Sequence, residues 1–167
     1  MQEEHGDLVG QTLAYIGDGN NVAHSLMLCG ALLGVNVRIA CPEGFEPLPG
    51  VLDQARSLAQ HGATIDVLTD PGKAVAGAQA VYTDVWASMG QEQEQAEREQ
   101  AFAGFSVDQA LMDQAAPGAI VLHCLPAHRG EEISAEVMEG PASRIFDQAE
   151  NRLHVQQALL AAVMGGL

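Results

Sequence analysis

Short apolar runs alternate with longer helical patterns along the chain, and this alternation restricts the possible folds more than any other feature of the sequence. Six runs have the length and the flanking turn residues that are typical of strands. We predict strands over residues 12–16, 35–40, 64–68, 80–83, 119–123 and 144–146. We predict helices over residues 21–33, 51–61, 91–103, 131–138 and 151–164. A further short helix follows Asp70-Pro71-Gly72 and ends near Gly77.

This order of elements predicts an α/β fold. Strands that are joined through helices need crossover connections, which are right-handed and make the strands parallel. Each apolar strand must be covered on both faces by the helices that connect it. We therefore expect a doubly wound, mostly parallel sheet with helices on both faces, a Rossmann-like three-layer domain. Its 167 residues suit one domain, which we expect to cover residues 1–167.

Acidic residues far outnumber basic ones in the composition. The chain has 22 Asp and Glu against seven Lys and Arg, which gives a formal net charge of −15. A charge of this sign repels the phosphate backbone of nucleic acids and the head groups of anionic lipids. We therefore expect neither nucleic acid nor membrane among the partners.

The cysteines indicate a reducing compartment. Cys29, Cys41 and Cys124 are odd in number, and each lies in an apolar or loop context. The chain does not open on a secretory signal pattern, and it has no apolar run long enough to span a bilayer. We expect a soluble, cytoplasmic protein with free thiols.

Polar residues collect directly after four of the predicted strands. Ligands of doubly wound sheets bind beyond the carboxyl ends of the strands, so these segments are the candidates for a site. They cover residues 17–21, 84–90, 123–130 and 147–152. We expect all four to face one cleft.

The first segment contains the pattern Gly-x-Gly-x-x-Val. It resembles a dinucleotide-binding fingerprint without the third glycine, and the second strand ends at residues 40–42 with no acidic residue for a ribose hydroxyl. A nicotinamide-dependent oxidoreductase is an alternative that rests on Gly17 and Gly19 alone. Asn20 and Asn21 offer donors near a helix N-terminus, where a carboxylate is favoured, although capping of that helix would also explain them.

The second segment combines a carboxylate with neutral polar groups. Asp84 can accept from a cationic amine, while the Ser88 hydroxyl and the Met89 backbone suit a polar head group. A zwitterionic amino acid would satisfy this set. The alternative is structural, with Asp84 forming a turn and Ser88 a cap.

The third segment places a thiol between an imidazole and a proline-fixed turn. His123-Cys124-Leu125-Pro126 admits a cysteine nucleophile. It also admits a zinc ligand pair, because Cys124 and His128 are four residues apart, but no further motif completes a zinc site. We expect no metal.

In the fourth segment an arginine stands near a predicted helix start. Arg152 falls in the first turn of the helix expected from residue 151, where the helix dipole disfavours a cation. This position favours an anionic ligand for Arg152. A salt bridge to Glu150 or Asp147 is the structural alternative.

Together, the four segments resemble ornithine carbamoyltransferases. The matching stretches are YIGDGNN at residues 15–21, YTDVWASMGQE at 82–92, HCLPAHRGEE at 123–132 and IFDQAENRLHV at 145–155. The resemblance extends over roughly residues 5–165. Ser-Met-Gly together with His-Cys-Leu-Pro distinguishes this family from its relatives that act on aspartate, putrescine or acetylated ornithine.

The resemblance implies transfer of a carbamoyl group from carbamoyl phosphate to the side-chain amine of ornithine, giving citrulline and phosphate in arginine metabolism without a cofactor. It implies that Asp84, Cys124 and Arg152 take part in catalysis, with Arg152 polarising the carbamoyl oxygen. The implied substrate-binding residues are Asn21, Asp84, Ser88, Met89, Cys124, Leu125 and Arg152.

The sequence departs from the family in lacking a whole domain. The family's Ser-x-Arg-Thr phosphate loop and its His-Pro-x-Gln segment do not occur in these 167 residues. We therefore expect the ornithine-binding half of a homo-oligomeric, trimer-based enzyme, inactive by itself because carbamoyl phosphate would bind only with the missing half. The terminal helix, apolar nearly all round, should need cover. The alternative is a stand-alone amino-acid-binding or regulatory module.

Overall fold

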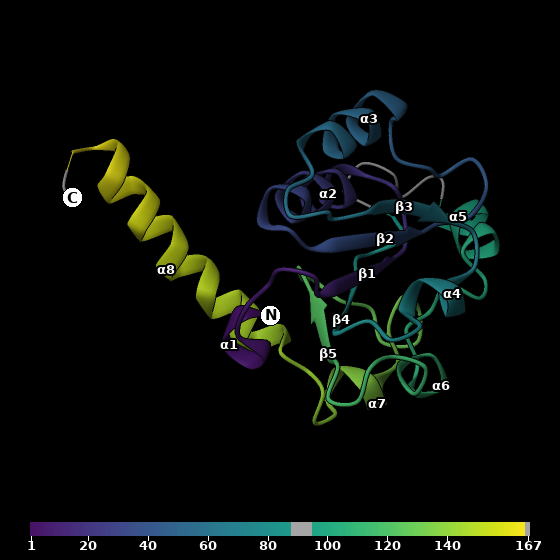
Figure 1. The fold of residues 1–167 in the computed structure, drawn as a ribbon. Coiled ribbons are helices and arrows are strands. Elements are labelled where there is room, and N and C mark those ends of the chain that lie inside the picture. The colour runs from purple at the N-terminus through teal and green to yellow at the C-terminus, as the bar shows by residue number, and fades with distance from the viewer. Residues whose placement is uncertain (88–94, 166–167) are drawn as a thin grey trace.

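The computed structural model describes residues 1–87 and 95–165, and Figure 1 shows that they are built around a parallel sheet. Within this described part the sheet has five strands in the order β3-β2-β1-β4-β5. The strands are β1 Thr12–Ile16, β2 Asn36–Ala40, β3 Ile65–Leu68, β4 Ala80–Thr83 and β5 Ile120–His123. All four strand pairings are parallel. The expected doubly wound α/β fold is confirmed.

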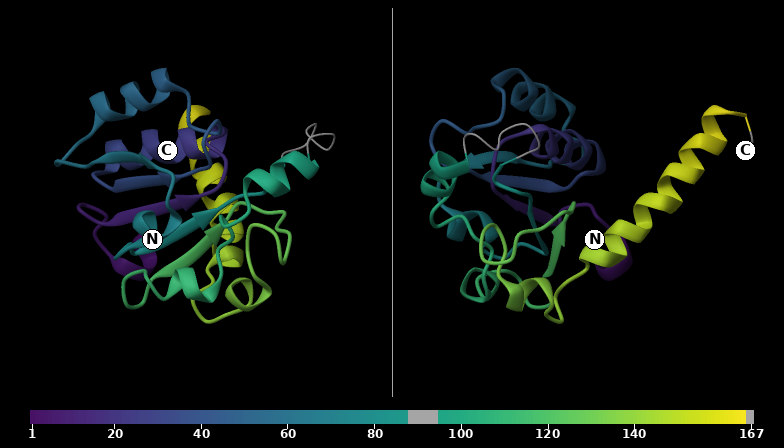
Figure 2. Two further views of the ribbon diagram at one scale, coloured as in Figure 1. Left: turned by 90° about the vertical axis from the view of Figure 1, so that its right-hand side faces the viewer. Right: turned by 180° about the vertical axis from the view of Figure 1, so that it is seen from behind.

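Helices cover both faces of this sheet (Figure 2). They are α1 Gln2–His5, α2 Asn21–Leu33, α3 Pro49–Leu58, α4 Pro71–Val75, α5 Gln95–Ala101, α6 Gln109–Met112, α7 Ala135–Met138 and α8 Ile145–Val163. Helices α2 and α3 pack together over one face, and α4, α6 and α7 pack over the other. The strand order reverses between β1 and β4, and such a reversal opens a ligand-binding crevice at the carboxyl ends of the strands.

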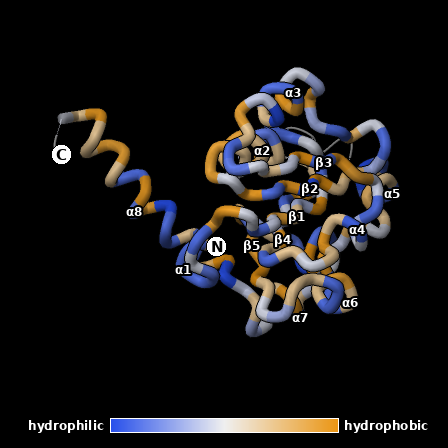
Figure 3. The backbone as a smooth tube through the Cα atoms, in the orientation of Figure 1, coloured by the Kyte–Doolittle hydropathy of each residue, from blue (hydrophilic) through white to orange (hydrophobic). Residues whose placement is uncertain are grey.

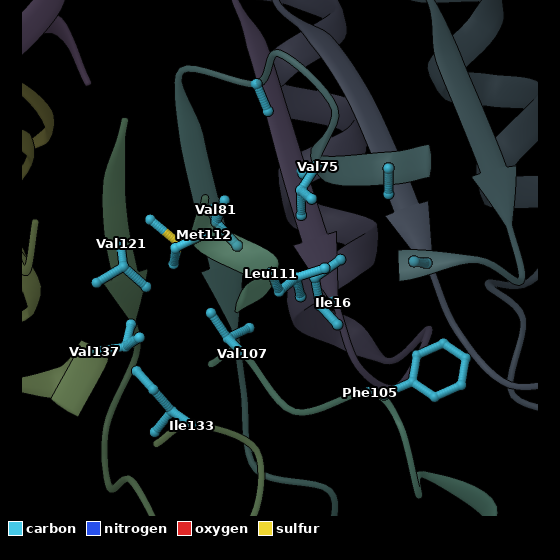
Figure 4. Close-up of a cluster of buried hydrophobic side chains, with 14 of the residues drawn as sticks. Ile16, Val75, Val81, Phe105, Val107, Leu111, Met112, Val121, Ile133 and Val137 are labelled. Atoms are coloured by element: carbon cyan, nitrogen blue, oxygen red, sulfur yellow. The ribbon is translucent and has the colours of Figure 1, made fainter. Parts of the chain in front are cut away.

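Two apolar clusters fill the space on either side of the sheet. Figure 4 shows the cluster beneath α4, α6 and α7, to which Ile16, Val81 and Val121 contribute from neighbouring strands. Tyr15 and Tyr82, which are adjacent to Ile16 and Val81 along the chain, belong to the cluster on the other face of the sheet. Because both faces are covered, all five residues of β1 are buried, which explains why this strand is a continuous apolar run in the sequence.

Helix α2 begins and ends as the sequence predicts. The Asn20 side chain caps it, because Oδ1 accepts from the backbone N–H groups of Val22 at 2.9 Å and Ala23 at 3.4 Å. The helix ends at Gly34, whose φ of 75° is in the left-handed region that glycine adopts most easily. The capping interpretation of Asn20 is therefore confirmed.

The sixth strand is a wrong prediction. Residues 144–146 do not form a strand, and the pairing beside β5 is limited to one isolated bridge between Val121 and Ser143. Ile145 instead begins α8 and is fully buried, so its apolar side chain reflects helix packing rather than a strand. Arg152 is consequently the eighth residue of α8, beyond the first turn, and the helix dipole gives no reason to expect an anionic ligand there.

Other helix boundaries also differ from the sequence predictions. Helices α1 and α6, each four residues long, were not predicted, because so short a segment has too little periodicity to detect. Helix α7 begins only at Ala135, where Ser134 caps it. Of the helix predicted over 91–103, residues 95–101 are helical, and residues 91–94 lie outside the described residues.

Helix α8 extends away from the rest of the domain (Figure 1). Its first turns are held by α1, since Arg144 Nε lies 2.8 Å from Glu4 Oε1 and Asn151 Nδ2 donates to Glu3 Oε2 at 2.7 Å. Farther along, hydrophobic stretches alternate with hydrophilic ones (Figure 3), and the exposed large apolar residues are Leu153, Val155, Leu159, Leu160, Val163 and Met164. No helix in the described part of the chain is long and apolar enough to cross a membrane.

Candidate functional site

Three strand exits meet at the carboxylate of Asp84. This side chain follows β4 and is only 6% exposed. Its Oδ1 accepts from Cys124 Sγ at 2.9 Å and from the Val85 backbone N–H at 2.8 Å, and its Oδ2 accepts from Asn20 Nδ2 at 3.2 Å. The β1, β4 and β5 exits thus come together as the strand pattern predicts. We call Asn20, Asp84, Cys124 and Leu125 the strand-exit site.

The thiol in this site is held in its protonated form. Burial raises the pKa of Cys124 to about 12, and the hydrogen bond to Asp84 and the charge of that carboxylate add to the increase. A nucleophilic cysteine needs the thiolate, which usually requires a cationic neighbour. The environment of Cys124 therefore disfavours the covalent-nucleophile alternative and favours a role in orienting a ligand.

Two tyrosines lie beneath the site. The rings of Tyr15 and Tyr82 stack with their centroids 6.0 Å apart. The Tyr15 hydroxyl is buried and has no hydrogen-bond partner among the residues that the structure describes. Burial, followed by the charges of Asp84 and Asp18, raises the pKa of Tyr15 well above its ordinary value. Two stacked aromatic rings therefore lie close to the carboxylates of Asp84 and Asp18.

Leu125 lies in an unusual backbone conformation directly after the thiol. Its φ is 59°, and the following Leu125–Pro126 peptide bond is cis. The Leu125 backbone N–H donates to His123 Nδ1 at 2.9 Å. The His123 ring therefore bonds to its own loop rather than pointing toward a ligand.

A buried glutamate supports this loop from the other side. Glu132 is fully buried, and its Oε1 lies 3.2 Å from His123 Nε2 and accepts from the His128 backbone N–H at 2.6 Å. Burial alone would raise the pKa of Glu132, but the hydrogen bonds from His123 and from the His128 backbone lower it overall. Sequence reasoning missed this residue, because an acidic residue beside Glu131 is normally part of a solvated surface.

A second charged residue that the sequence did not reveal joins the β1 and β4 exits. Arg98 Nη1 lies 2.6 Å from Asp18 Oδ2 and donates to the Trp86 backbone oxygen at 2.7 Å. Its guanidinium carbon also lies 5.1 Å from the centroid of the Phe45 ring. Arg98 is only 7% exposed, so its bonds to Asp18 and Trp86 are largely shielded from water. They hold the loops after β1 and β4 together.

The remaining predicted residues are Asn21, Ser88, Met89 and Arg152. Asn21 is the exposed first residue of α2, and Ser88 and Met89 lie outside the described residues. The Arg152 side chain is exposed on α8 and forms no hydrogen bond or ion pair with another described residue. The alternative salt bridges from Arg152 to Glu150 and Asp147 are therefore not formed.

Helix α8 nevertheless contacts the site through Gln148. Its Oε1 accepts from the His123 backbone N–H at 3.1 Å, and its Nε2 donates to the Tyr82 hydroxyl at 2.9 Å. Arg152 stands four residues farther along the same helix, one turn away. The strand exits thus fix the direction in which α8 presents this arginine.

The glycines of the first segment serve chain packing. Gly19 N–H donates to Phe45 O at 2.8 Å, and a Cβ at Gly19 would lie 2.3 Å from Pro47 N. The loop around residues 45–47 therefore covers the backbone that a pyrophosphate would approach in a dinucleotide-binding domain. This packing removes the main support for the nicotinamide alternative.

One group of side chains has the composition of a metal site. His128, Glu131 and Glu132 each offer a ligand atom, and these atoms lie within 4.8 Å of one another. Glu132 Oε1 already accepts two hydrogen bonds, while Oε2 lies 3.7 Å from Nδ1 of the exposed His128 and has no hydrogen-bond partner among the described residues. Cys124, the zinc ligand considered with His128, instead bonds to Asp84.

Comparison with known proteins shows the family of this chain. A family model described as the Asp/Orn-binding domain of aspartate/ornithine carbamoyltransferase matches residues 9–163. The chain belongs to this family. The match includes all three strand exits that meet at Asp84.

Individual relatives resemble the whole chain. The ornithine carbamoyltransferase of Parasynechococcus marenigrum is 82% identical over 167 residues, which are 100% of this chain and 52% of the relative. That of Prochlorococcus marinus strain MIT 9313 is 76% identical, with the same coverage. The chain spans about half the length of the curated relatives it matches.

Solved structures share the fold over the same span. The ornithine carbamoyltransferase of Pyrococcus furiosus superposes with a TM-score of 0.93 at 51% identity, covering 99% of this chain and 53% of the other. That of Gloeobacter violaceus gives a TM-score of 0.90 at 53% identity, covering 98% and 54%. This likeness extends to the protruding α8, since almost the whole chain is covered.

Proposed function

We propose that this chain is the ornithine-binding half of an ornithine carbamoyltransferase. The observation that carries the proposal is the convergence of Asn20 and Cys124 on the buried carboxylate of Asp84. The hydrogen-bond donors to Asp84 among the described residues are all uncharged, so this buried carboxylate suits the cationic amine of an amino acid. The names of the close relatives narrow the amino acid to ornithine.

In the proposed site Asp84 binds the head group of ornithine together with Asn21, Ser88 and Met89. Asn21 stands at the N-terminus of α2, where the helix dipole favours the carboxylate of the substrate. Asp84 suits the ammonium group. The amino acid would thus lie along the carboxyl edge of the sheet with its side chain directed toward Cys124 and Leu125.

The proposed reaction joins the side-chain nitrogen to the carbamoyl carbon. The neutral amine attacks that carbon, the carbon–oxygen bond to phosphate breaks, and the nitrogen releases a proton. Negative charge develops on the carbamoyl oxygen, which a guanidinium stabilises well, and Arg152 is assigned this role. Cys124 remains a thiol and, with Leu125, holds the amine in position.

The half of the relatives that these 167 residues do not cover would bind the phosphate group of carbamoyl phosphate and cover α8. One arginine cannot replace the several donors that a phosphate dianion needs. Large apolar side chains are exposed on α8 beyond its second turn and at its C-cap: Leu153, Val155, Leu159, Leu160, Val163 and Met164. We infer that the companion half packs against this helix and thereby brings Arg152 to the site.

The metabolic role, location and assembly of the protein are inferred from its relatives. We infer a role in arginine metabolism, a cytoplasmic location and a homo-oligomeric, trimer-based parent enzyme. The names of the relatives, which are all ornithine carbamoyltransferases in the cases compared above, support this inference.

Complementation tests the proposal. The purified chain should form no citrulline from ornithine and carbamoyl phosphate. Adding a separately expressed carbamoyl-phosphate-binding half from a close relative should restore citrulline formation. Citrulline formed by the chain alone at an enzyme-like rate would contradict the division of labour proposed here.

A stand-alone amino-acid-binding module is the second candidate, favoured by the self-contained site around Asp84. It predicts tight ornithine binding by the chain alone and no gain of activity with the companion half. The same complementation experiment, combined with a binding measurement, separates the two candidates.

A further inference from the structure

Two buried ionisable residues remain without a role in the proposed reaction. His123 is 1% exposed and Glu132 is 0% exposed, and they face each other with Nε2 and Oε1 3.2 Å apart. Burying a carboxylate is costly unless hydrogen bonds compensate for the lost water. Such a pair inside the loop that holds Cys124 therefore calls for a physical reason.

The hydrogen bonds fix which nitrogen of His123 carries the proton. The Leu125 backbone N–H donates to Nδ1 at 2.9 Å, so Nδ1 is an acceptor and carries no proton. The ring proton must then be on Nε2, from which it is donated to Glu132 Oε1. Glu132 thus selects the tautomer that can hold the Leu125 backbone.

Glu132 also holds the far end of the same loop. Its Oε1 accepts from the His128 backbone N–H at 2.6 Å, so one oxygen atom ties residue 123 to residue 128. The backbone of Glu132 is itself fixed, because its carbonyl oxygen accepts from Val107 N–H at 2.9 Å and Ile133 bridges to Val107. The carboxylate is therefore anchored on a rigid support.

We propose that Glu132 is a positioning residue that acts through His123 to hold the Leu125 backbone and, with it, the Cys124 thiol against Asp84. Without the carboxylate, His123 can turn or change tautomer, and the Leu125 N–H loses its acceptor. Leu125 has a φ of 59°, in the left-handed region that is uncommon for residues other than glycine, so the hydrogen bond to His123 helps to hold this conformation. The consequence for ornithine binding rests on the proposed function.

The first test needs no substitution in the measured protein. ¹⁵N NMR of the histidine rings in the wild-type chain distinguishes a protonated from an unprotonated ring nitrogen. His123, assigned from its disappearance in a His123→Gln sample, should carry its ring proton on Nε2. A proton on Nδ1 would overturn the proposal whatever the variants do.

The second test uses the thiol as a reporter of the loop. In a Cys29→Ser background, which removes the exposed cysteine, alkylation of Cys124 by iodoacetamide is followed by peptide mass spectrometry. Glu132→Ala should speed alkylation about tenfold, the effect of losing one charge-assisted hydrogen bond. Glu132→Gln keeps a carbonyl acceptor for both donors and should stay within about threefold of the background rate.

A matched control separates positioning from general destabilisation. Val75→Ala removes buried side-chain volume from α4, which packs mainly against β1, β2 and α6, and should lower the melting temperature without exposing Cys124. Equal acceleration by Val75→Ala and Glu132→Ala, or an unchanged rate in a folded Glu132→Ala, would overturn the proposal. If Glu132→Ala does not fold, the wild-type tautomer and the rate in Glu132→Gln still decide it.

Protection by a ligand distinguishes failure here from failure of the proposed function. Norvaline, an unreactive analogue of ornithine, should slow alkylation of Cys124 in the background chain. If norvaline gives no protection while Glu132→Ala still accelerates alkylation, the ornithine assignment fails and the positioning role stands. Protection by norvaline with no effect of Glu132→Ala would overturn the positioning role and leave the ornithine assignment in place.

Discussion

The strand-exit site and helix α8 differ in how far the chain completes them. At the strand-exit site Asp84 accepts three hydrogen bonds from three different segments, and its surroundings are buried. On α8, Arg152 and a run of large apolar side chains are exposed without partners among the described residues. The chain therefore builds the proposed ornithine site by itself, whereas Arg152 is exposed and needs a further contact to take part in the reaction. A domain can fold around a binding site and still depend on a partner for catalysis.

The largest contrast should come from substituting Arg152. Because its side chain makes no hydrogen bond or ion pair with the described residues, Arg152→Ala should leave the free energy of unfolding unchanged within about 0.5 kcal/mol. In the enzyme completed with a companion half, it should lower kcat about 100- to 1,000-fold, as expected for loss of a group that stabilises a developing oxyanion. Thermal melting and steady-state kinetics measure the two effects. If Arg152→Ala lowered the free energy of unfolding and left kcat unchanged, Arg152 would have a structural role and no catalytic one.

Substitution of Asp84 should weaken ornithine binding even in the chain without a companion half. Asp84→Ala removes the expected partner of the substrate ammonium and should weaken ornithine binding at least about 30-fold by calorimetry. Asp70→Ala is the control, since Asp70 lies two residues after β3, outside the strand-exit site, where its side chain caps α4. Equal losses in both variants would mean that binding depends on general stability rather than on Asp84.

A smaller effect is expected at Cys124. The completed enzyme with Cys124→Ser should keep measurable turnover, with kcat lowered about tenfold, because a hydroxyl can also donate to Asp84. The thiol, with its pKa raised to about 12, stays protonated at neutral and mildly alkaline pH. The pH profile of kcat over that range should therefore be the same in wild type and Cys124→Ser. Complete inactivity of a folded Cys124→Ser would restore the nucleophile alternative.

The smallest effect should come from the apolar side chains of α8. Leu159 and Leu160 are 60% and 56% exposed, so replacing both with Gln should change the stability of the isolated chain by less than about 0.5 kcal/mol per site. The same pair of substitutions should weaken association with a companion half in sedimentation experiments. A large loss of stability in the chain alone would indicate that α8 is covered in solution.

The sequence predicted the sheet and the first half of the chain well, because the relevant signals are local. β1, α2 and β4 have the predicted bounds, and the asparagine before α2 caps it as its type suggests. The prediction failed at residues 144–146. There a short apolar run begins α8, and so few residues cannot distinguish a strand from the first turn of a helix.

The candidate site was predictable only in part. Asp84 and Cys124 follow strands directly, so the topology alone brings them together. Arg98 and Glu132 belong to the same region but come from a helix and a loop that sequence patterns cannot place against the strand exits. Their burial depends on tertiary packing, and a charged side chain is normally expected at the surface.

Calorimetry of the wild-type chain with ornithine decides whether the strand-exit site binds the substrate. We expect one binding site per chain, in which norvaline competes with ornithine and which is lost in Asp84→Ala but kept in Arg152→Ala. Binding that survives Asp84→Ala, or that disappears in Arg152→Ala alone, would contradict the assignment of ornithine to the strand-exit site.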